Sequence, residues 1–177
     1  MGRGEEVIIF NTTIMQPTII TIPSKKLVGL SIKGKISFDD TKAMWQRFQK
    51  GKKEIENRVE GELHSMQIYP KGFKMEEFTE DTQFERRAAV EVSTFGAKPE
   101  GFEDFELAGG LYAKFIHKGP VRAFIETSNY IFKEWLPQSD YRVDDRAHFE
   151  ILGAKYLGPE HPDSEEEIFI PLKIKAS

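Results

Sequence analysis

The sequence has no cysteine among its 177 residues, which excludes disulfides, thiolate metal sites and a cysteine nucleophile. It also has no apolar run near the roughly 20 residues that a membrane span needs. The first residues, Met1 to Glu6, lack the apolar stretch of a signal peptide. These absences predict a cytoplasmic protein of a reducing compartment, with no membrane partner.

The chain also has no surplus of positive charge. It holds 25 Lys and Arg against 29 Asp and Glu, a net charge of −4, and the two signs are interspersed along the sequence. Nucleic-acid affinity depends on a basic surface, so direct nucleic-acid binding is not expected. The aromatic share of 12% is large enough to fill a core and also to line a pocket.

Motifs of common catalytic sites are missing as well. The four histidines form no pair at i and i+4 on a helix, so we predict no metal site. Gly109 and Gly110 precede a strand and do not open a helix, so no phosphate loop and no cofactor are predicted. No G-x-S-x-G motif is present. A pair of carboxylates with a Tyr or Trp is what remains for acid or base chemistry, and it would need burial to raise a Glu pKa.

What the chain does have is a duplication. A strand, a helix and two further strands are predicted in residues 26–93, and the same order is predicted in residues 109–175, with residues 94–106 as a linker. Each half alone would have a marginal core. We therefore predict one domain over residues 18–177, preceded by a leader or edge segment at residues 1–17.

The spacing between the two halves is nearly constant. Gly34 and Gly119 end corresponding strands at an offset of 119 − 34 = 85 positions, and residues 64–69 match residues 148–153 at 148 − 64 = 84. Repeats of this kind indicate similar structural units. Two similar halves that meet along one sheet leave a concave seam, where small molecules commonly bind.

The helices are marked by their caps and by apolar periodicity. Asp39 and Asp40 can cap a helix that starts near Thr41, and Pro120 suits the first turn of the second helix. One face of the second helix is formed by Val121, Phe124, Ile125, Ser128, Phe132 and Trp135. The predicted fold is α+β: a duplicated β-α-β-β unit, with an antiparallel sheet, two helices on one face and a central ligand cleft.

Side-chain alternation then predicts which residues line that cleft. In the last strand Ile168, Ile170 and Leu172 share the side that the helices cover, as Met66 and Ile68 are expected to do in an earlier strand. Acidic and aromatic side chains are expected on the opposite, open face: Glu167, Phe169, Glu150, Tyr69 and Tyr112. A carboxylate between aromatic walls is suited to an organic cation.

Each of these residues also has a structural interpretation. Glu167 ends the acidic run Glu165-Glu166-Glu167, and such runs are usually solvated. Glu150 could pair with Lys114 across the sheet. The aromatic candidates, including Trp135 on the helix, are more often packing residues than ligand walls.

Several motifs together resemble the GyrI-like family, the effector-binding domains of AraC- and MerR-type regulators. The resemblance rests on residues 110–120 (GLYAKFIHKGP), 135–139 (WLPQS), 149–151 (FEI) and 167–172 (EIFIPL), and on residues 44–48 (MWQRF), 55–58 (IENR) and 89–92 (AVEV) in the first half. It implies a central cleft for cationic or amphipathic organic molecules, of the multidrug-binding kind. Glu167 matches the family's central glutamate, and Glu150 matches a second recurring acid.

The resemblance leaves three functions open. Residues 1–25 are too few for a helix-turn-helix, so we expect a stand-alone effector-binding domain that binds a small molecule and serves transcription regulation, with a regulator or other protein as a possible partner. A small hydrolase of reactive toxins that uses Glu167 is the alternative. A gyrase-inhibitor-like module that acts on a protein partner is the third. We favour ligand binding over catalysis, because no activated water and no matched pKa is visible in the sequence.

Overall fold

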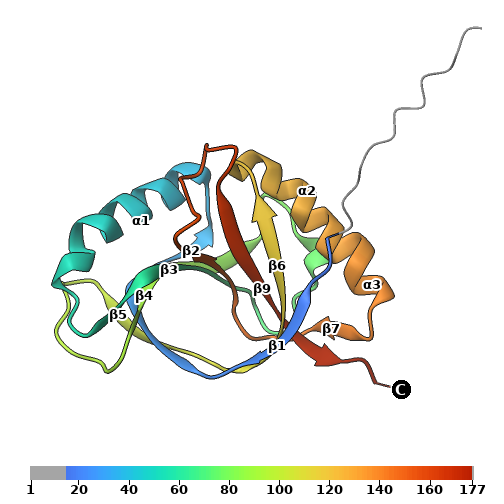
Figure 1. The fold of residues 1–177 in the computed structure, drawn as a ribbon, viewed down its shortest axis with the longest axis horizontal. Coiled ribbons are helices and arrows are strands. Elements are labelled where there is room, and N and C mark those ends of the chain that lie inside the picture. Colours follow the sequence, from blue (N-terminus) through green and yellow to red (C-terminus); the bar gives the residue numbers. More distant parts are fainter. Residues whose placement is uncertain (1–14, 177) are drawn as a thin grey trace, which may run out of the picture.

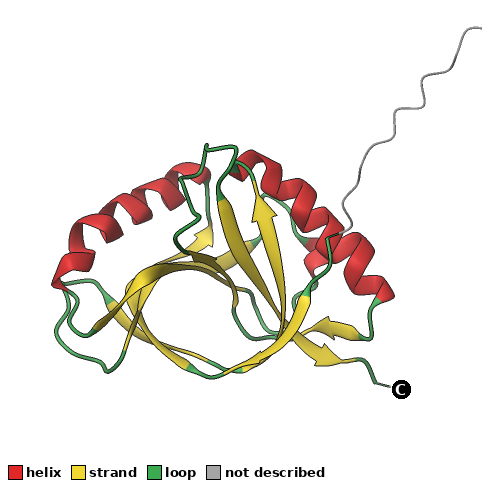
Figure 2. Ribbon diagram, in the orientation of Figure 1, coloured by secondary structure: helices red, strands yellow, loops and turns green. Residues whose placement is uncertain are grey.

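The computed structural model describes residues 15–176, so residues 1–14 of the predicted leader lie outside the described part. The strands are β1 (Thr18–Ile22), β2 (Lys25–Lys35), β3 (Arg58–Ile68), β4 (Gln83–Val92), β5 (Glu103–Leu107), β6 (Gly110–Lys118), β7 (Tyr141–Val143), β8 (His148–Leu152) and β9 (Glu165–Ile174). They form one curled antiparallel sheet in the order β1-β6-β9-β8-β3-β4-β2-β5, and β7 pairs with β9 (Figure 2).

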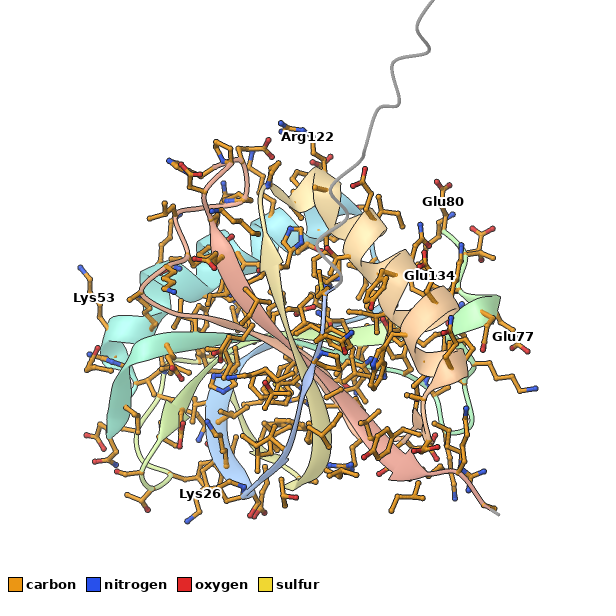
Figure 3. All side chains as sticks on the ribbon, turned by 45° about the vertical axis from the view of Figure 1, so that its right-hand side comes forward. Lys26, Lys53, Glu77, Glu80, Arg122 and Glu134 are labelled. Carbon is orange, nitrogen blue, oxygen red and sulfur yellow. The ribbon has the colours of Figure 1, made fainter. Side chains whose placement is uncertain are left out.

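Two helical segments lie apart from each other over one face of the sheet (Figure 1). The first is α1 (Phe38–Gly51), followed by a 3₁₀ turn. The second runs continuously through α2 (Phe124–Asn129), a π-helical turn (Tyr130–Trp135) and α3 (Leu136–Gln138). Shorter 3₁₀ turns are Lys52–Glu54, Met75–Glu77 and Val121–Ala123. Charged side chains such as Lys53, Glu80 and Glu134 point outward from the body of the molecule (Figure 3).

The sheet order confirms the duplicated α+β fold. From the middle outward it reads β8-β9-β6 on one side and β3-β4-β2 on the other, with β3 and β8 paired at the centre. Val28 of β2 packs with α1, and Ala113 of β6 packs with the second helical segment, at an offset of 113 − 28 = 85. The seam between the two repeats therefore runs along the β3 and β8 pair.

The curl gives the sheet two buried faces. The outer face packs against the helices in two separate clusters, one for each repeat. The inner face encloses a third cluster, in which Tyr112, Phe149 and Phe169 meet Leu27 and Leu107. The predicted open face is therefore wrong: the face opposite the helices is packed core, because the sheet curls round on itself.

The expected offset of 84 for the second strand is also wrong. Ser65 and Glu150 are opposite each other in the register of β3 and β8, and both line the helix side of the sheet. The offset that keeps equivalent side chains on the same face is thus 150 − 65 = 85. A slip of one residue moves every side chain of a strand to the other face. Met66 accordingly packs in the inner cluster and not against the helices.

Both ends of the sheet differ from the prediction in one further way. The segment 94–106, interpreted as a linker, contains the start of β5, which pairs with β2 from Lys25↔Leu107 to Gly29↔Glu103. β1 occupies the opposite edge, beside β6. These two edge strands lie outside the duplicated β-α-β-β units.

Candidate ligand-binding cleft

A cleft lies over the β3 and β8 seam, between α1 and the second helical segment. Its volume is about 1780 Å³, larger than the roughly 300–1,000 Å³ of an ordinary small-molecule pocket. Trp45 lines it from α1, and Phe124 and Phe132 line it from the second helical segment. Two facing helices and a sheet floor thus form a space with apolar walls that can hold a bulky molecule.

Glu150 is the buried acid on the floor of this cleft. It lies in the middle of β8, opposite Ser65 of β3 and Ile168 of β9, and is only 8% exposed. Gln67 donates a hydrogen bond from Nε2 to Glu150 Oε2 at 2.9 Å. Burial raises the pKa of Glu150, against the opposing effects of the Gln67 hydrogen bond and the positive charge of Arg86. A desolvated carboxylate of this kind gains most from a cationic partner.

Glu166 is a second acid in the cleft, on β9. It shares the helix-facing side with Ile168, two positions along the strand. Burial and the negative charge of Glu150 raise the pKa of Glu166 to about 8, although Arg86 acts in the opposite direction. The two acids therefore resist being ionised together unless positive charge is added to the cleft.

An aromatic group adjoins these acids. The ring of Tyr69 stacks with Phe73 and Phe84, each at 5.3 Å between centroids, and meets His148 edge-on at 5.0 Å. Burial raises the pKa of Tyr69, and so does the charge of Glu150, so its hydroxyl stays protonated. Burial lowers the pKa of His148 to about 3. This wall is therefore neutral at physiological pH.

The cleft contains some of the residues predicted from the sequence. Glu150 and Tyr69 line it, and it also reaches Phe169, although the Phe169 ring stacks on Phe149 at 4.6 Å in the inner cluster. The prediction that Glu150 and Glu167 share a face is wrong, because Glu167 is opposite Ile151 in the register of β8 and β9, on the other side of the sheet.

Three predicted residues do not line the cleft. Glu167 forms an ion pair with Lys114 at 3.3 Å. Tyr112 is fully buried in the inner cluster, where its hydroxyl donates to the Ala147 carbonyl oxygen at 3.1 Å. Trp135 meets the ring of Phe115 edge-on at 5.2 Å, in the core of the second repeat.

Sequence reasoning missed Glu166 and Arg86, which both line the cleft. Alternation in β9 was a usable signal, since Glu166 has the same parity as Ile168, but the acidic run of three residues hid it. Arg86, Ala88 and Val90 are every second residue along β4, and Ala88 and Val90 pack under α1, so Arg86 lies on the same helix-facing side of the sheet.

Two further findings bear on the kind of site. In residues 15–176 no group of three or more His, Asp or Glu side chains is placed to hold a metal ion. None of the helices in that range is long and apolar enough to cross a membrane.

Comparison with known proteins identifies the family. The model of the GyrI-like small molecule binding domain matches residues 15–173, so the chain belongs to the GyrI-like family. The transcriptional regulator BrlR of Pseudomonas aeruginosa is 26% identical over 161 residues, which are 89% of this chain and 56% of BrlR. The chain thus spans a little over half the length of this curated relative. It is a GyrI-like small-molecule-binding domain, related to the effector domains of transcription regulators.

Solved structures share the fold. The C-terminal domain of EcmrR superposes with a TM-score of 0.72 at 13% identity, covering 92% of this chain and 99% of that domain. SAV2435 bound to tetraphenylphosphonium gives 0.64 at 18%, covering 90% and 94%. A hydrolase encoded by lin2189 from Listeria innocua gives 0.58 at 13%, covering 89% and 92%.

Proposed function

We propose that the cleft binds a bulky apolar organic cation and that the carboxylate of Glu150 supplies the opposite charge. The observation that supports this most directly is the burial of Glu150 at the centre of the cleft floor, where Gln67 donates a hydrogen bond to its carboxylate. Removing a carboxylate from water is costly, and a bound cation offsets that cost.

The surroundings of Glu150 favour the same ligand. Where Glu150, Glu166 and Arg86 lie, the two negative charges exceed the one positive charge, so this group of three has a net charge of −1 when both acids are ionised. Trp45, Phe132 and Tyr69 line the same cleft, and organic cations are attracted to aromatic rings. The structural neighbour SAV2435 was solved with tetraphenylphosphonium, a cation of this class.

Replacing Glu150 by Gln tests the proposal. The exchange keeps shape and hydrogen bonding but removes the charge, so the affinity for tetraphenylphosphonium should fall by a factor of about ten, since a partly desolvated ion pair contributes roughly 1–3 kcal/mol. Isothermal titration calorimetry measures the effect. Neutral triphenylphosphine oxide, which has a similar shape, should lose little affinity.

Glu167→Gln is the matched control, because Glu167 lies on the other face of the sheet and pairs with Lys114. This variant should bind tetraphenylphosphonium like the unaltered protein. A loss with Glu167→Gln and none with Glu150→Gln would transfer the role to Glu167, as the family resemblance implied. Retained affinity in both variants would refute a role for either acid.

The hydrolase alternative is tested on the same variants. One observation favours it: burial holds the pKa of Glu150 and of Glu166 above the usual range, as acid or base catalysis requires. Each electrophilic compound that binds should be recovered and analysed by mass spectrometry. Unchanged compound supports a binding protein, whereas a product whose formation stops in Glu150→Gln would replace the proposed function by hydrolysis.

A further inference from the structure

Arg86 on the floor of the cleft carries a guanidinium with a buried N–H that has no partner among the described residues. It projects from β4 opposite Gln67 in the register of β3 and β4, on the side that faces the cleft. Its Nε is buried and has no hydrogen-bond acceptor among the described residues. Within residues 15–176 its guanidinium makes no ion pair, and its one recorded side-chain partner is the face of the Phe84 ring at 5.7 Å.

The next residue shows what a structural arginine looks like in this strand. Arg87 points to the other face, where its Nε donates to Glu85 Oε1 at 2.6 Å and its guanidinium pairs with Glu103 at 3.5 Å. Its guanidinium also lies 4.3 Å from the centroid of the Phe105 ring. A guanidinium has five N–H donors and no acceptor, and a buried donor without a partner is costly. Arg86 therefore has the donors of Arg87 without its partners.

The duplication makes the position of Arg86 informative. Arg86 lies two residues before Ala88, which pairs with Ser65, and Glu166 lies two residues before Ile168, which pairs with Glu150. Arg86 and Glu166 are therefore equivalent positions of the two repeats, with opposite charges. Of the three groups, the first repeat supplies the cation Arg86, and the second repeat supplies the acids Glu150 and Glu166.

We propose that the ligand of this cleft is an amphoteric aromatic molecule, whose cationic part lies over Glu150 and Glu166 while an oxyanion, such as a carboxylate, accepts hydrogen bonds from Arg86. The proposal rests on the proposed function and adds a second polar subsite to it. Arg86 then selects among cations, because a carboxylate can accept two parallel N–H hydrogen bonds from a guanidinium. A cation without such a group leaves these donors unpaired.

Rhodamine B and its ethyl ester form a matched pair of probes. Both contain the same aromatic xanthene cation, but only rhodamine B has a free carboxylate. The protein should bind rhodamine B about tenfold more tightly than the ester, because only the acid form satisfies Arg86 through charge-assisted hydrogen bonds. Fluorescence anisotropy measures both affinities directly.

Arg86→Gln should weaken the binding of rhodamine B without weakening the binding of its ester. Rhodamine B should lose about tenfold, whereas the ester should bind as before or more tightly, since a repelling charge has gone. A general disturbance of the cleft would weaken both dyes. Arg142→Gln, which removes the same charge from an exposed position of β7 outside the cleft, should leave both affinities unchanged.

The outcomes separate the two proposals. Equal binding of the two dyes, or tighter binding of the ester, overturns the Arg86 subsite while the cation site stands. If Arg86→Gln binds neither dye, Arg86→Lys separates the causes, because it keeps the positive charge and should keep part of the preference for rhodamine B. An unchanged preference in Arg86→Lys would show that the positive charge, and not the parallel N–H donors of the guanidinium, selects the carboxylate. If the unaltered protein binds neither dye nor tetraphenylphosphonium, the proposed function itself fails and the Arg86 subsite with it.

Discussion

At the scale of single residues, the chemistry of the cleft depends on three ionisable side chains that influence one another. The charge of Glu150 raises the cost of ionising Glu166, and the charge of Arg86 lowers the cost of ionising both acids. A cation that enters the cleft adds to the effect of Arg86 and so favours the ionised acids. Ligand binding and proton release should therefore be coupled.

The affinity for tetraphenylphosphonium should increase as the pH rises through about 8. The pKa of Glu166 is about 8 without ligand, so below that pH a bound cation must displace a proton, and above it the carboxylate is already charged. The ligand keeps its charge at every pH, and release of one proton gives at most about a tenfold change in affinity for each pH unit. Titrations from about pH 6.5 to about pH 9.5 measure this slope.

Glu166→Gln should make the affinity for tetraphenylphosphonium nearly independent of pH, because the group that releases the proton has been removed. The neighbouring tyrosines do not interfere, because burial raises the pKa of both Tyr69 and Tyr156. A flat profile in the unaltered protein would exclude proton release from Glu166. A slope that persists in Glu166→Gln would assign the proton to Glu150.

At the scale of elements, the two helices that wall the cleft are built differently. The first is a regular helix with a capping box. The second contains the π-helical turn Tyr130–Trp135, which holds more residues per turn than an α-helix. Trp135 is consequently turned from the face of Phe124 and Phe132 towards Phe115. Helical periodicity assumes an α-helix throughout, so it placed Trp135 on the same helix face as Phe124 and Phe132.

Replacing Ser37 by Ala should destabilise the protein by about 1 kcal/mol through loss of the cap of α1. Ser37 Oγ accepts a hydrogen bond from the Asp40 N–H at 3.1 Å, and Asp40 Oδ2 accepts one from the Ser37 N–H at 2.8 Å. Urea unfolding measures the change. Asp39→Ala alters the same turn without touching the cap, so it should cost much less; equal losses would show that the cap contributes nothing specific.

At the scale of the whole molecule, the curled sheet separates a ligand-facing side from an enclosed core. That core contains a histidine: both ring nitrogens of His64 are buried without a hydrogen-bond partner within the described residues, and its ring stacks on Phe149 at 5.8 Å. Burial, together with the positive charge of Lys25, lowers the pKa of His64 to about 4. The folded protein therefore keeps His64 neutral where the unfolded chain protonates it.

The free energy of unfolding should fall as the pH drops from about 6.5 towards about 4. In that window the unfolded chain takes up a proton on His64 and the folded protein does not, so protonation favours unfolding; above about 6.5 the effect vanishes. His148, whose pKa burial lowers to about 3, adds to the effect. The His64→Leu variant should lose about 3 kcal/mol less of its free energy of unfolding than the unaltered protein over this pH window.

Urea unfolding at several pH values measures both curves. His161→Gln, at an exposed position, is the control and should follow the unaltered protein. If His64→Leu and the unaltered protein lose stability in parallel between about pH 6.5 and about 4, His64 is not the group that titrates.

The sequence by itself determined the duplicated β-α-β-β plan, the family, and the alternation within β9. These follow from local periodicity and from matching residues 85 positions apart. Alternation also correctly placed Ile168 and Ile170 opposite Glu167, because β9 has one apolar side and one mixed side at that end.

Only the tertiary structure decided which acid lies in the cleft. In β8 the residues from His148 to Ile151 are all buried, because the helices cover one face and the curl of the sheet encloses the other. Local alternation cannot then show which face is which, and the pairing of Glu150 with Ser65 and Ile168 fixes it. That pairing depends on contacts between segments far apart in the chain, so only the tertiary structure shows that Glu150 and Glu166 line the cleft while Glu167 does not.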